Sequence, residues 1–491
     1  MLHKKKDRRQ YPNKVELEKR HEVDERETRV NNIEQHSEAY NNHESLDQQK
    51  LSSHPIPSEK RNPRQLPKII TDPTKLAIIS DYNRRNHQIR KSINKQEIKP
   101  AQVSPGICPN CNGPIDEFGY YARWCLPCQS KRFKNNFSSW SSGHDDIDIF
   151  IQRTQLYSKS WVDFLEWIPY NNFKNIKKIG SGGYGYVYKS MWLDGPHEKW
   201  DSNTAQYIRC GKWRVVLKSF DISANKNLFY ELRKYLDSGI NNGLYISRYY
   251  GITRDPITKN YMMVMQYASD GDLRKYYEQN SKSLTWQKRL DILHSITAGL
   301  TRIHINNLVH QNLHTGNILI HSSMALLSDL GFYKLSDGDE GLYCVLPFTA
   351  PETLRNKLFT KESNIYSFGM IMWELAYCKK PFSDRAHNLD LAIDICEGFH
   401  PAFKSKIPKC YFDIMNQCLS LDPSMRPTAE QLYQTFGEWL CMLSSVPNSY
   451  IAEQFQEAEE GLSLFDNKFE VHPEAIYNSR YYNFKELELL P

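Results

Sequence analysis

The feature that most constrains this chain is a glycine-rich loop that turns back into a strand. Its sequence, Gly180-Ser181-Gly182-Gly183-Tyr184-Gly185-Tyr186-Val187, has the spacing G-x-G-x-x-G-x-V. Glycines allow backbone N–H groups to approach phosphates, because no side chain stands in the way. A dinucleotide-binding loop of similar spacing leads into a helix, whereas the residues that follow here, Tyr186 to Trp192, favour a strand. We therefore predict a β-hairpin that covers a phosphate-bearing ligand.

A lysine at the end of the next predicted strand supplies a partner for those phosphates. The strand is Val215-Val216-Leu217-Lys218, and Glu231 follows thirteen residues later. A strand lysine held by a helix glutamate is a known arrangement for contacting the α- and β-phosphates of a nucleotide. A lone lysine or glutamate is usually a surface charge, but the register with the glycine loop favours the functional interpretation.

Three further motifs follow in a fixed order. They are His310-Gln311-Asn312-Leu313-His314-Thr315-Gly316-Asn317, Ser328-Asp329-Leu330-Gly331 and Thr349-Ala350-Pro351-Glu352. With the glycine loop and Lys218, they resemble the catalytic loop, the metal-binding motif and the end of the activation segment of eukaryotic protein kinases. Asn364 to Gly369 and Asp422 to Pro427 extend the resemblance, which implies a pair between Arg426 and Glu352. Through Tyr261 to Met265 and His472 to Tyr477, the chain also resembles a fungal kinase-like group with a cysteine module ahead of the kinase domain.

The resemblance implies a two-lobed α+β fold that binds ATP and Mg²⁺. Carried over position by position, the residues expected around ATP are Gly180, Gly182, Gly185, Val187, Val216, Lys218, Glu231, Met265, Gln266, Ala268, Asn317, Leu319 and Asp329. Of these, Asn317 and Asp329 would also bind Mg²⁺, and amide and carboxylate oxygens suit this hard cation.

The chain departs from the family at the position of the catalytic base. The expected catalytic positions are Lys218, Asp329 and the base, which is Asn312 here. An amide cannot take the proton of a substrate hydroxyl, yet a base typically contributes only about 10²- to 10⁴-fold in rate. Gln311 and Asn364 replace the arginine and the aspartate that normally support this loop. We therefore expect weak or lost phosphotransfer to protein hydroxyls, the alternative being an active serine/threonine or tyrosine kinase.

Four cysteines ahead of the kinase-like region form a second candidate site. Cys108, Cys111, Cys125 and Cys128 have the spacing C-x₂-C-x₁₃-C-x₂-C, which can present four thiolates to structural Zn²⁺. Two disulfides or a redox pair are the alternatives. Eleven cysteines in a chain without an export signal indicate a reducing compartment, which favours zinc. The adjacent run Lys131-Arg132-Phe133-Lys134 leaves nucleic-acid binding by this module as a third functional hypothesis.

The rest of the sequence sets the domain organisation. Residues 1–100 contain no Gly, Phe, Trp or Cys, which predicts a disordered charged tail. Trp161, Phe164, Leu165 and Trp167 have helical spacing, and we expect them to pack a connector onto its neighbour. The predicted units are a tail (1–104), a zinc module (105–135), a helical connector (136–172), a kinase domain (173–441), and a C-terminal helix with a tail (442–491).

The charge and hydropathy patterns indicate location and partners. A net charge of +6 over 491 residues gives little support for nucleic acid as the main partner. The basic run Lys4 to Arg9 is not followed by an apolar stretch, and no segment has the length and apolarity of a membrane span. We therefore expect a cytoplasmic or nuclear location and protein partners.

Overall fold

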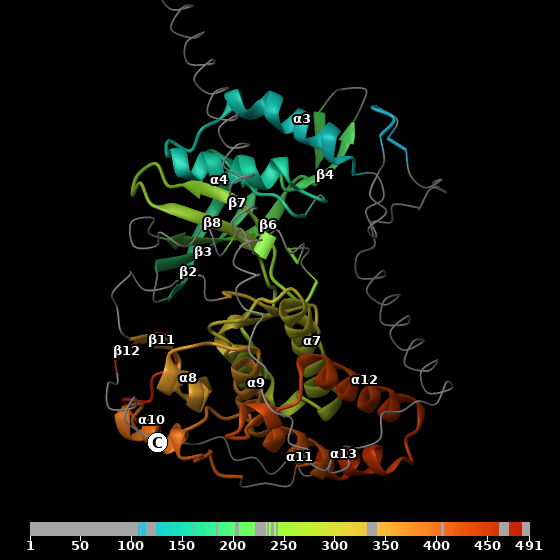
Figure 1. Ribbon diagram of the computed structural model, residues 1–491, viewed down its shortest axis with the longest axis vertical. Coiled ribbons are helices and arrows are strands. Elements are labelled where there is room, and N and C mark those ends of the chain that lie inside the picture. Colours follow the sequence, from blue (N-terminus) through green and yellow to red (C-terminus); the bar gives the residue numbers. More distant parts are fainter. Residues whose placement is uncertain are drawn as a thin grey trace, which may run out of the picture.

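The computed structural model has two lobes, and the α+β fold expected from the sequence is confirmed (Figure 1). It describes residues 107, 108, 110–113, 124–160, 162–182, 185–201, 206–220, 232, 235, 236, 240, 241, 244–330, 341–403, 407–460 and 471–483. The disordered tail predicted for residues 1–104 lies outside these ranges. Within the described part of the chain, every helix is too short or too polar to cross a membrane.

The upper lobe is built on a six-stranded sheet with the order β1-β7-β8-β6-β3-β2. Its strands are β1 (Glu166–Trp167), β2 (Phe173–Gly182), β3 (Gly185–Trp192), β6 (Trp213–Phe220), β7 (Tyr249–Arg254) and β8 (Tyr261–Gln266). β2 and β3 form an antiparallel hairpin, so the prediction that the glycine loop returns as a strand is confirmed. Alternate residues of β6, Val215 and Leu217, are buried and form part of the core of this lobe.

The lower lobe is mainly helical. Its elements are α6 (Leu273–Asn280), α7 (Trp286–Ile305), β9 (Ile318–His321), β10 (Met324–Leu327), α8 (Pro351–Asn356), α9 (Lys361–Tyr377), α10 (Leu389–Cys396), α11 (Lys409–Cys418), α12 (Ala429–Ser445) and α13 (Tyr450–Glu460). Every residue of α9 from Ser363 to Tyr377 is buried, which makes it the central helix of the lobe. A reciprocal cap between Thr360 and Ser363 fixes where α9 begins.

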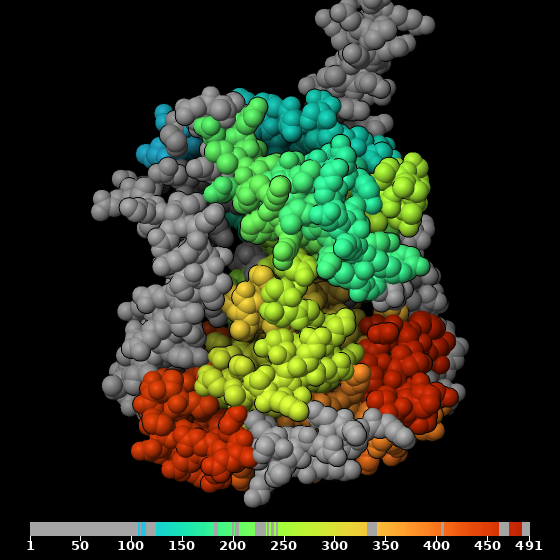
Figure 2. Space-filling model, turned by 180° about the vertical axis from the view of Figure 1, so that it is seen from behind, coloured from blue at the N-terminus to red at the C-terminus, as the bar shows by residue number. Residues whose placement is uncertain are grey.

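Two helices cover the upper lobe on the side away from the lower lobe (Figures 1 and 2). They are α3 (Leu126–Asn136) and α4 (Asp145–Leu156), and α4 has three aspartates in its first turn, where the helix dipole favours negative charge. Phe164 packs with the aromatic side chains of α3, so the prediction that the connector packs onto its neighbour is confirmed there.

The helix indicated by the spacing of residues 161–167 is not found in the described part of this stretch. Trp161 lies outside the described residues, Phe164 and Leu165 are not helical, and Trp167 belongs to β1. This short strand pairs in parallel with β7, and Gly251 on β7 lies so close to Glu166 that an added Cβ would stand 2.1 Å from its carbonyl oxygen. Strand pairing at the sheet edge therefore overrides the local pattern.

A hairpin fastens the helical layer to the sheet. It consists of β4 (His197–Asp201) and β5 (Gln206–Arg209), between β3 and β6 in the sequence. The Tyr207 hydroxyl donates to Gln129 of α3 over 2.6 Å, and its ring stacks on Phe133. Arg209 on the same hairpin pairs with Glu166 of β1 over 2.5 Å.

The C-terminal segment returns to the gap between the lobes. Residues 471–483 run along the lower lobe and end in β12 (Arg480–Tyr482). β12 pairs antiparallel with β11 (Leu342–Cys344), which lies just ahead of the Thr349-Ala350-Pro351-Glu352 motif. More than 130 residues of sequence separate these two strands.

Candidate active site

A cleft of about 800 Å³ between the lobes collects the residues singled out by the motifs. Its lining includes Gly180, Val187, Val216, Lys218, Met265, Gln266, Ala268, Asn312, Asn317, Leu319 and Asp329. This volume lies within the range of about 300–1,000 Å³ that is usual for small-molecule sites. Glu231, the expected partner of Lys218, lies outside the described residues.

Gly182 and Gly185 face each other at the end of the β2–β3 hairpin. Gly185 has a φ of +141°, and an added Cβ would lie 2.2 Å from Ser219 Oγ. The same hydroxyl accepts from the Tyr186 N–H over 2.7 Å. Gly185 is thus required by close packing on β6, the strand that carries Lys218.

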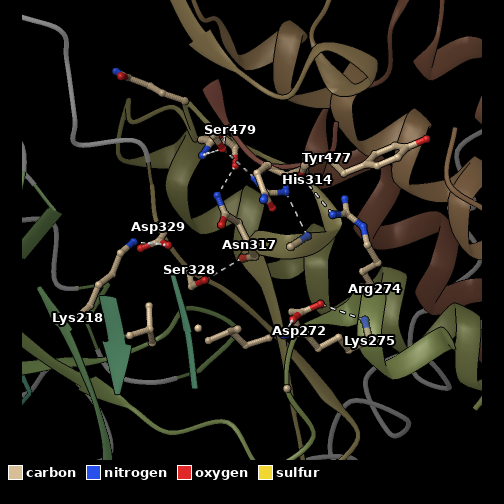
Figure 3. Close-up of a pocket in the computed structure, with 18 of the residues that line it drawn as sticks. Lys218, Asp272, Arg274, Lys275, His314, Asn317, Ser328, Asp329, Tyr477 and Ser479 are labelled. Carbon is tan, nitrogen blue, oxygen red and sulfur yellow. Dashed lines mark hydrogen bonds and ion pairs between the residues drawn. The ribbon is translucent and has the colours of Figure 1, made fainter. Parts of the chain in front are cut away.

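An ion pair joins the lobes in the cleft. Lys218 Nζ on β6 lies 2.6 Å from Asp329 Oδ2, which follows β10 in the lower lobe. Figure 3 shows the two side chains pointing toward each other. Asp329 has a φ of +53°, a conformation that non-glycine residues rarely adopt and that is found at functional sites. The backbone is therefore constrained where the carboxylate enters the cleft.

The loop that carries Asn312 is held from below by Asn364 of α9. Asn364 Oδ1 accepts from the His310 N–H over 2.9 Å, and its Nδ2 donates to the His310 carbonyl over 2.7 Å. A carboxylate can accept the first bond but cannot donate the second. The amide of Asn364 therefore holds both the backbone N–H and the carbonyl of His310.

Asn317 is oriented by the same loop. Its Nδ2 donates to the Asn312 carbonyl over 2.8 Å, which leaves Oδ1 as the atom that can bind a metal. With the carboxylate of Asp329 in the same cleft, the donor set fits Mg²⁺. ATP would supply the phosphoryl group. Gln266 at the end of β8 and Ala268 just after it form the hinge between the lobes, and they line the end of the cleft where the adenine would lie.

The catalytic loop itself carries little positive charge. Burial lowers the pKa of His310 to about 4 and holds the pKa of His314 well below its usual value. Both imidazoles are therefore neutral at pH 7. With Gln311 in the position of an arginine, this loop provides no cation for a phosphate on the activation segment.

Arg426 and Glu352 form the predicted pair. Two guanidinium nitrogens of Arg426 lie 2.6 and 2.9 Å from the two carboxylate oxygens of Glu352, and the arginine side chain is fully buried. The guanidinium also donates to the Ser420 and Glu362 carbonyls. This bidentate pair fixes the end of the activation segment to the helical core.

The four cysteines of the N-terminal module lie together. Their sulfur atoms all lie within 4.8 Å of one another, with Cys108 to Cys128 at 3.7 Å and Cys111 to Cys125 at 3.5 Å. A tetrahedron of sulfurs around zinc at about 2.3 Å has edges of roughly 3.8 Å, whereas a disulfide needs about 2.05 Å. The geometry therefore fits one Zn²⁺.

The basic run beside this module does not present its aromatic residue. Phe133 is buried among Trp124, Phe137 and Phe164. The alternation of basic and aromatic residues in Lys131-Arg132-Phe133-Lys134 thus reflects helix packing, because the aromatic ring faces inward.

Sequence reasoning missed three residues that line the cleft from the C-terminal segment, Tyr477, Asn478 and Ser479. Figure 3 shows Tyr477 and Ser479 in the same pocket as Lys218 and Asp329. The resemblance of residues 472–477 to the fungal group was the one signal in this stretch, and it carried no information on where the segment lies.

Comparison with known proteins identifies this arrangement. Residues 173–436 match the family of protein tyrosine and serine/threonine kinases. The chain is 28% identical over 321 residues to mouse receptor-interacting serine/threonine-protein kinase 4, an overlap of 62% of this chain and 38% of that protein. The human protein of that name is 29% identical over 274 residues, 52% of this chain and 30% of that protein.

A similar match is found in a virus. A putative serine/threonine-protein kinase/receptor of Acanthamoeba polyphaga mimivirus is 26% identical over 278 residues, 56% of this chain and 15% of its own length. The chain thus spans less than half of the length of each of these relatives.

Proposed function

The chain belongs to the protein tyrosine and serine/threonine kinase family, and we propose that it binds Mg²⁺-ATP while transferring phosphate weakly or not at all. The observation that carries the proposal is that Lys218, Asn317 and Asp329 line one cleft together with an altered residue at the base position. Lys218 and Asp329 meet at 2.6 Å in the cleft, whereas the residue at the base position is Asn312.

The nucleotide half of the proposal is supported by the residues that line the cleft. Lys218 would contact the phosphates, Asn317 and Asp329 would hold Mg²⁺, and the β2–β3 hairpin would cover the nucleotide. Val216 adds bulk above the adenine position, where the family commonly has alanine, which favours somewhat weaker ATP binding. The chain keeps the means to orient a phosphoryl donor.

The catalytic half rests on the chemistry of an amide. Asn312 can orient a hydroxyl by hydrogen bonds but cannot accept its proton at neutral pH. Positioning and charge neutralisation still contribute to phosphoryl transfer without a base. The second candidate, a fully active kinase, is favoured by the intact anchoring of the loop on Asn364 and by the names of the relatives.

The four-cysteine module would bind structural zinc. Four thiolates close the coordination shell, so the metal would have no open position for catalysis. Its helix α3 is joined to the upper lobe through Tyr207. We propose that this metal stabilises the layer above the nucleotide site.

Thermal unfolding of the full chain with Mg²⁺-ATP, together with radiolabel transfer to a generic protein substrate, tests the proposal. A ligand at 100 times its Kd stabilises the native state by about 2.7 kcal/mol, so a Mg²⁺-dependent rise of the unfolding temperature is expected. Lys218→Met should abolish the rise, and Lys212→Met, on an exposed turn, should keep it.

Each outcome has a distinct meaning. A shift with transfer at least 100-fold below that of the Asn312→Asp variant supports weak or lost phosphotransfer. A shift with equal transfer by both chains assigns the protein as an active kinase. The lack of any shift would exclude the nucleotide site.

A further inference from the structure

The C-terminal segment places a serine hydroxyl on the residue at the catalytic-base position. Ser479 Oγ lies 2.9 Å from Asn312 Nδ2, 3.2 Å from Asn312 Oδ1 and 3.4 Å from His314 Nε2. In protein kinases the residue at the base position contacts the hydroxyl that receives the phosphate. Ser479 therefore lies where an acceptor serine would have to lie.

The backbone around Ser479 is held as a peptide ligand would be. β12 adds an antiparallel strand to β11, with Tyr482 opposite Leu342 and Arg480 opposite Cys344. An extended peptide that adds a strand to an exposed edge gains affinity from main-chain hydrogen bonds and specificity from alternate side chains. The edge used here belongs to the activation segment, next to the catalytic loop.

The residue two positions before the serine is anchored in a pocket of the lower lobe. The Tyr477 ring is buried edge-on against His387 at 4.8 Å, and its hydroxyl donates to the Pro381 carbonyl over 2.9 Å. Arg274 donates to the Tyr477 carbonyl over 3.2 Å and is itself held by the buried carboxylate of Glu374. The pocket is thus preorganised by residues of the kinase core.

A second anchor follows the serine. The Arg480 guanidinium donates to the Tyr482 hydroxyl and to the His387 carbonyl. Tyr482 is buried beside β11. The hydroxyl of Ser479 is therefore fixed from both sides, and it lies in the same cleft as Lys218 and Asp329.

We propose that residues 471–483 occupy the acceptor-peptide site of this protein as a built-in competitor. The site then takes an extended serine peptide with an aromatic residue two positions before the serine and another three positions after it. The assignment of Asn312 to the acceptor site rests on the proposed function, but occupancy of the site by the segment does not require ATP. Other proteins can bind at the acceptor-peptide site only after residues 471–483 have left it.

Peptide binding to the full chain, without nucleotide, tests the proposal. The probe is a fluorescein-labelled peptide with the sequence of residues 471–483, followed by fluorescence anisotropy. The Tyr477→Ala/Tyr482→Ala chain, which lacks both aromatic anchors, should bind the probe at least about tenfold more tightly than the unaltered chain, because its own segment no longer competes. Tyr450→Ala, at an exposed position on α13, should bind as the unaltered chain does.

The probe with Ser479→Ala should bind roughly two- to tenfold more weakly, since it loses the hydrogen bonds to Asn312. Equal affinity of the labelled serine peptide for the unaltered and the double-variant chains, or lack of binding to the double variant, overturns the proposal. These outcomes are independent of the Mg²⁺-ATP measurement, which tests the proposed function alone.

A cross-link provides a second test that does not depend on removing buried aromatic residues. Tyr343 and Tyr481 are direct cross-strand partners, a separation that a disulfide can span. Mild oxidation of the Tyr343→Cys/Tyr481→Cys chain should give a disulfide between these positions, mapped by mass spectrometry, and the Tyr343→Cys/Tyr450→Cys chain should not. Lack of the 343–481 link would show that the segment lies elsewhere and would overturn the proposal.

Discussion

Asn312 separates two roles that one aspartate fills in an active protein kinase, which are contact with the acceptor hydroxyl and removal of its proton. The backbone carbonyl of Asn312 accepts from Asn317, and its side chain donates to the Ser479 hydroxyl. It lacks the basicity to remove that hydroxyl's proton. Position and proton transfer can therefore be tested independently at this one residue.

Asn312→Asp should raise radiolabel transfer from ATP by about 10²- to 10⁴-fold, because it restores a base at the acceptor hydroxyl. The Kd for Mg²⁺-ATP, measured by calorimetry, should stay within about threefold, since the nucleotide contacts remain. Gln279→Glu, the same amide-to-carboxylate change on an exposed turn of α6, serves as the control. A change in ATP affinity as large as the change in turnover would contradict the role assigned to Asn312.

The Arg426–Glu352 pair should contribute to the free energy of unfolding. Arg426→Ala leaves the Glu352 carboxylate without its main partner, and breaking a buried ion pair costs about 3–5 kcal/mol. Urea unfolding should show a loss of this size. Lys409→Ala, which breaks the exposed Lys409–Asp413 pair, should leave the unfolding midpoint nearly unchanged. Similar unfolding midpoints for the two variants would contradict the proposed contribution of Arg426 to stability.

At the scale of secondary-structure elements, α3 and the β4–β5 hairpin depend on each other. α3 carries Cys128 and Gln129, and the hairpin contributes Tyr207, which contacts Gln129 and Phe133. Zinc at the cysteines would fix the start of α3. The hairpin, which contacts α3 and lies between β3 and β6 in the sequence, would then also be held in place. The module is therefore a layer of the upper lobe.

Removal of one zinc ligand should destabilise this layer. We expect one zinc per chain by atomic emission, lost in Cys111→Ser, together with a lower unfolding temperature, because the metal contributes directly to folding of such small modules. Cys210→Ser, an exposed cysteine outside the cluster, should retain both the metal and the unfolding temperature. Full zinc content in Cys111→Ser would contradict the four-thiolate site.

Helices, strands and loops could be predicted from the sequence where their function requires particular residues at a fixed spacing. The glycine hairpin, the strand of Lys218 and the loop from His310 to Asn317 follow from motifs whose residues must meet one ligand. β1 and β12 were not predictable in this way. Each is a strand of two or three residues, and its stability comes from a partner strand distant in sequence, which the local pattern does not reveal.

For the molecule as a whole, the buried histidines make stability depend on pH. Burial lowers the pKa of His310 to about 4 and also lowers the pKa of His304, below an unfolded value of about 6.5. The unfolded chain therefore binds more protons than the native chain between these pH values, and stability falls as pH decreases through this window. Burial raises the pKa of the Glu374 carboxyl, which acts in the opposite direction.

Urea unfolding between pH 7 and pH 4.5 can isolate the contribution of one histidine. His310→Gln should lower stability at pH 7 but reduce the dependence on pH by up to about 1.4 kcal/mol per pH unit, which corresponds to one proton. Gln279→Ala, at an exposed position on α6 without a titratable group, is the control and should preserve the dependence. An unchanged slope in His310→Gln would show that its imidazole does not titrate on unfolding.

The pairing of β1 with β7 bears on how this protein can be divided into fragments. A fragment that starts at Phe173 would keep every kinase motif but lose Glu166 and Trp167, so β7 would become an unpaired sheet edge with buried residues along it. Open edges of this kind invite association with other chains and poor solubility. A fragment expected to remain monomeric therefore starts ahead of Glu166, so the start of the family match at residue 173 is not a folding boundary.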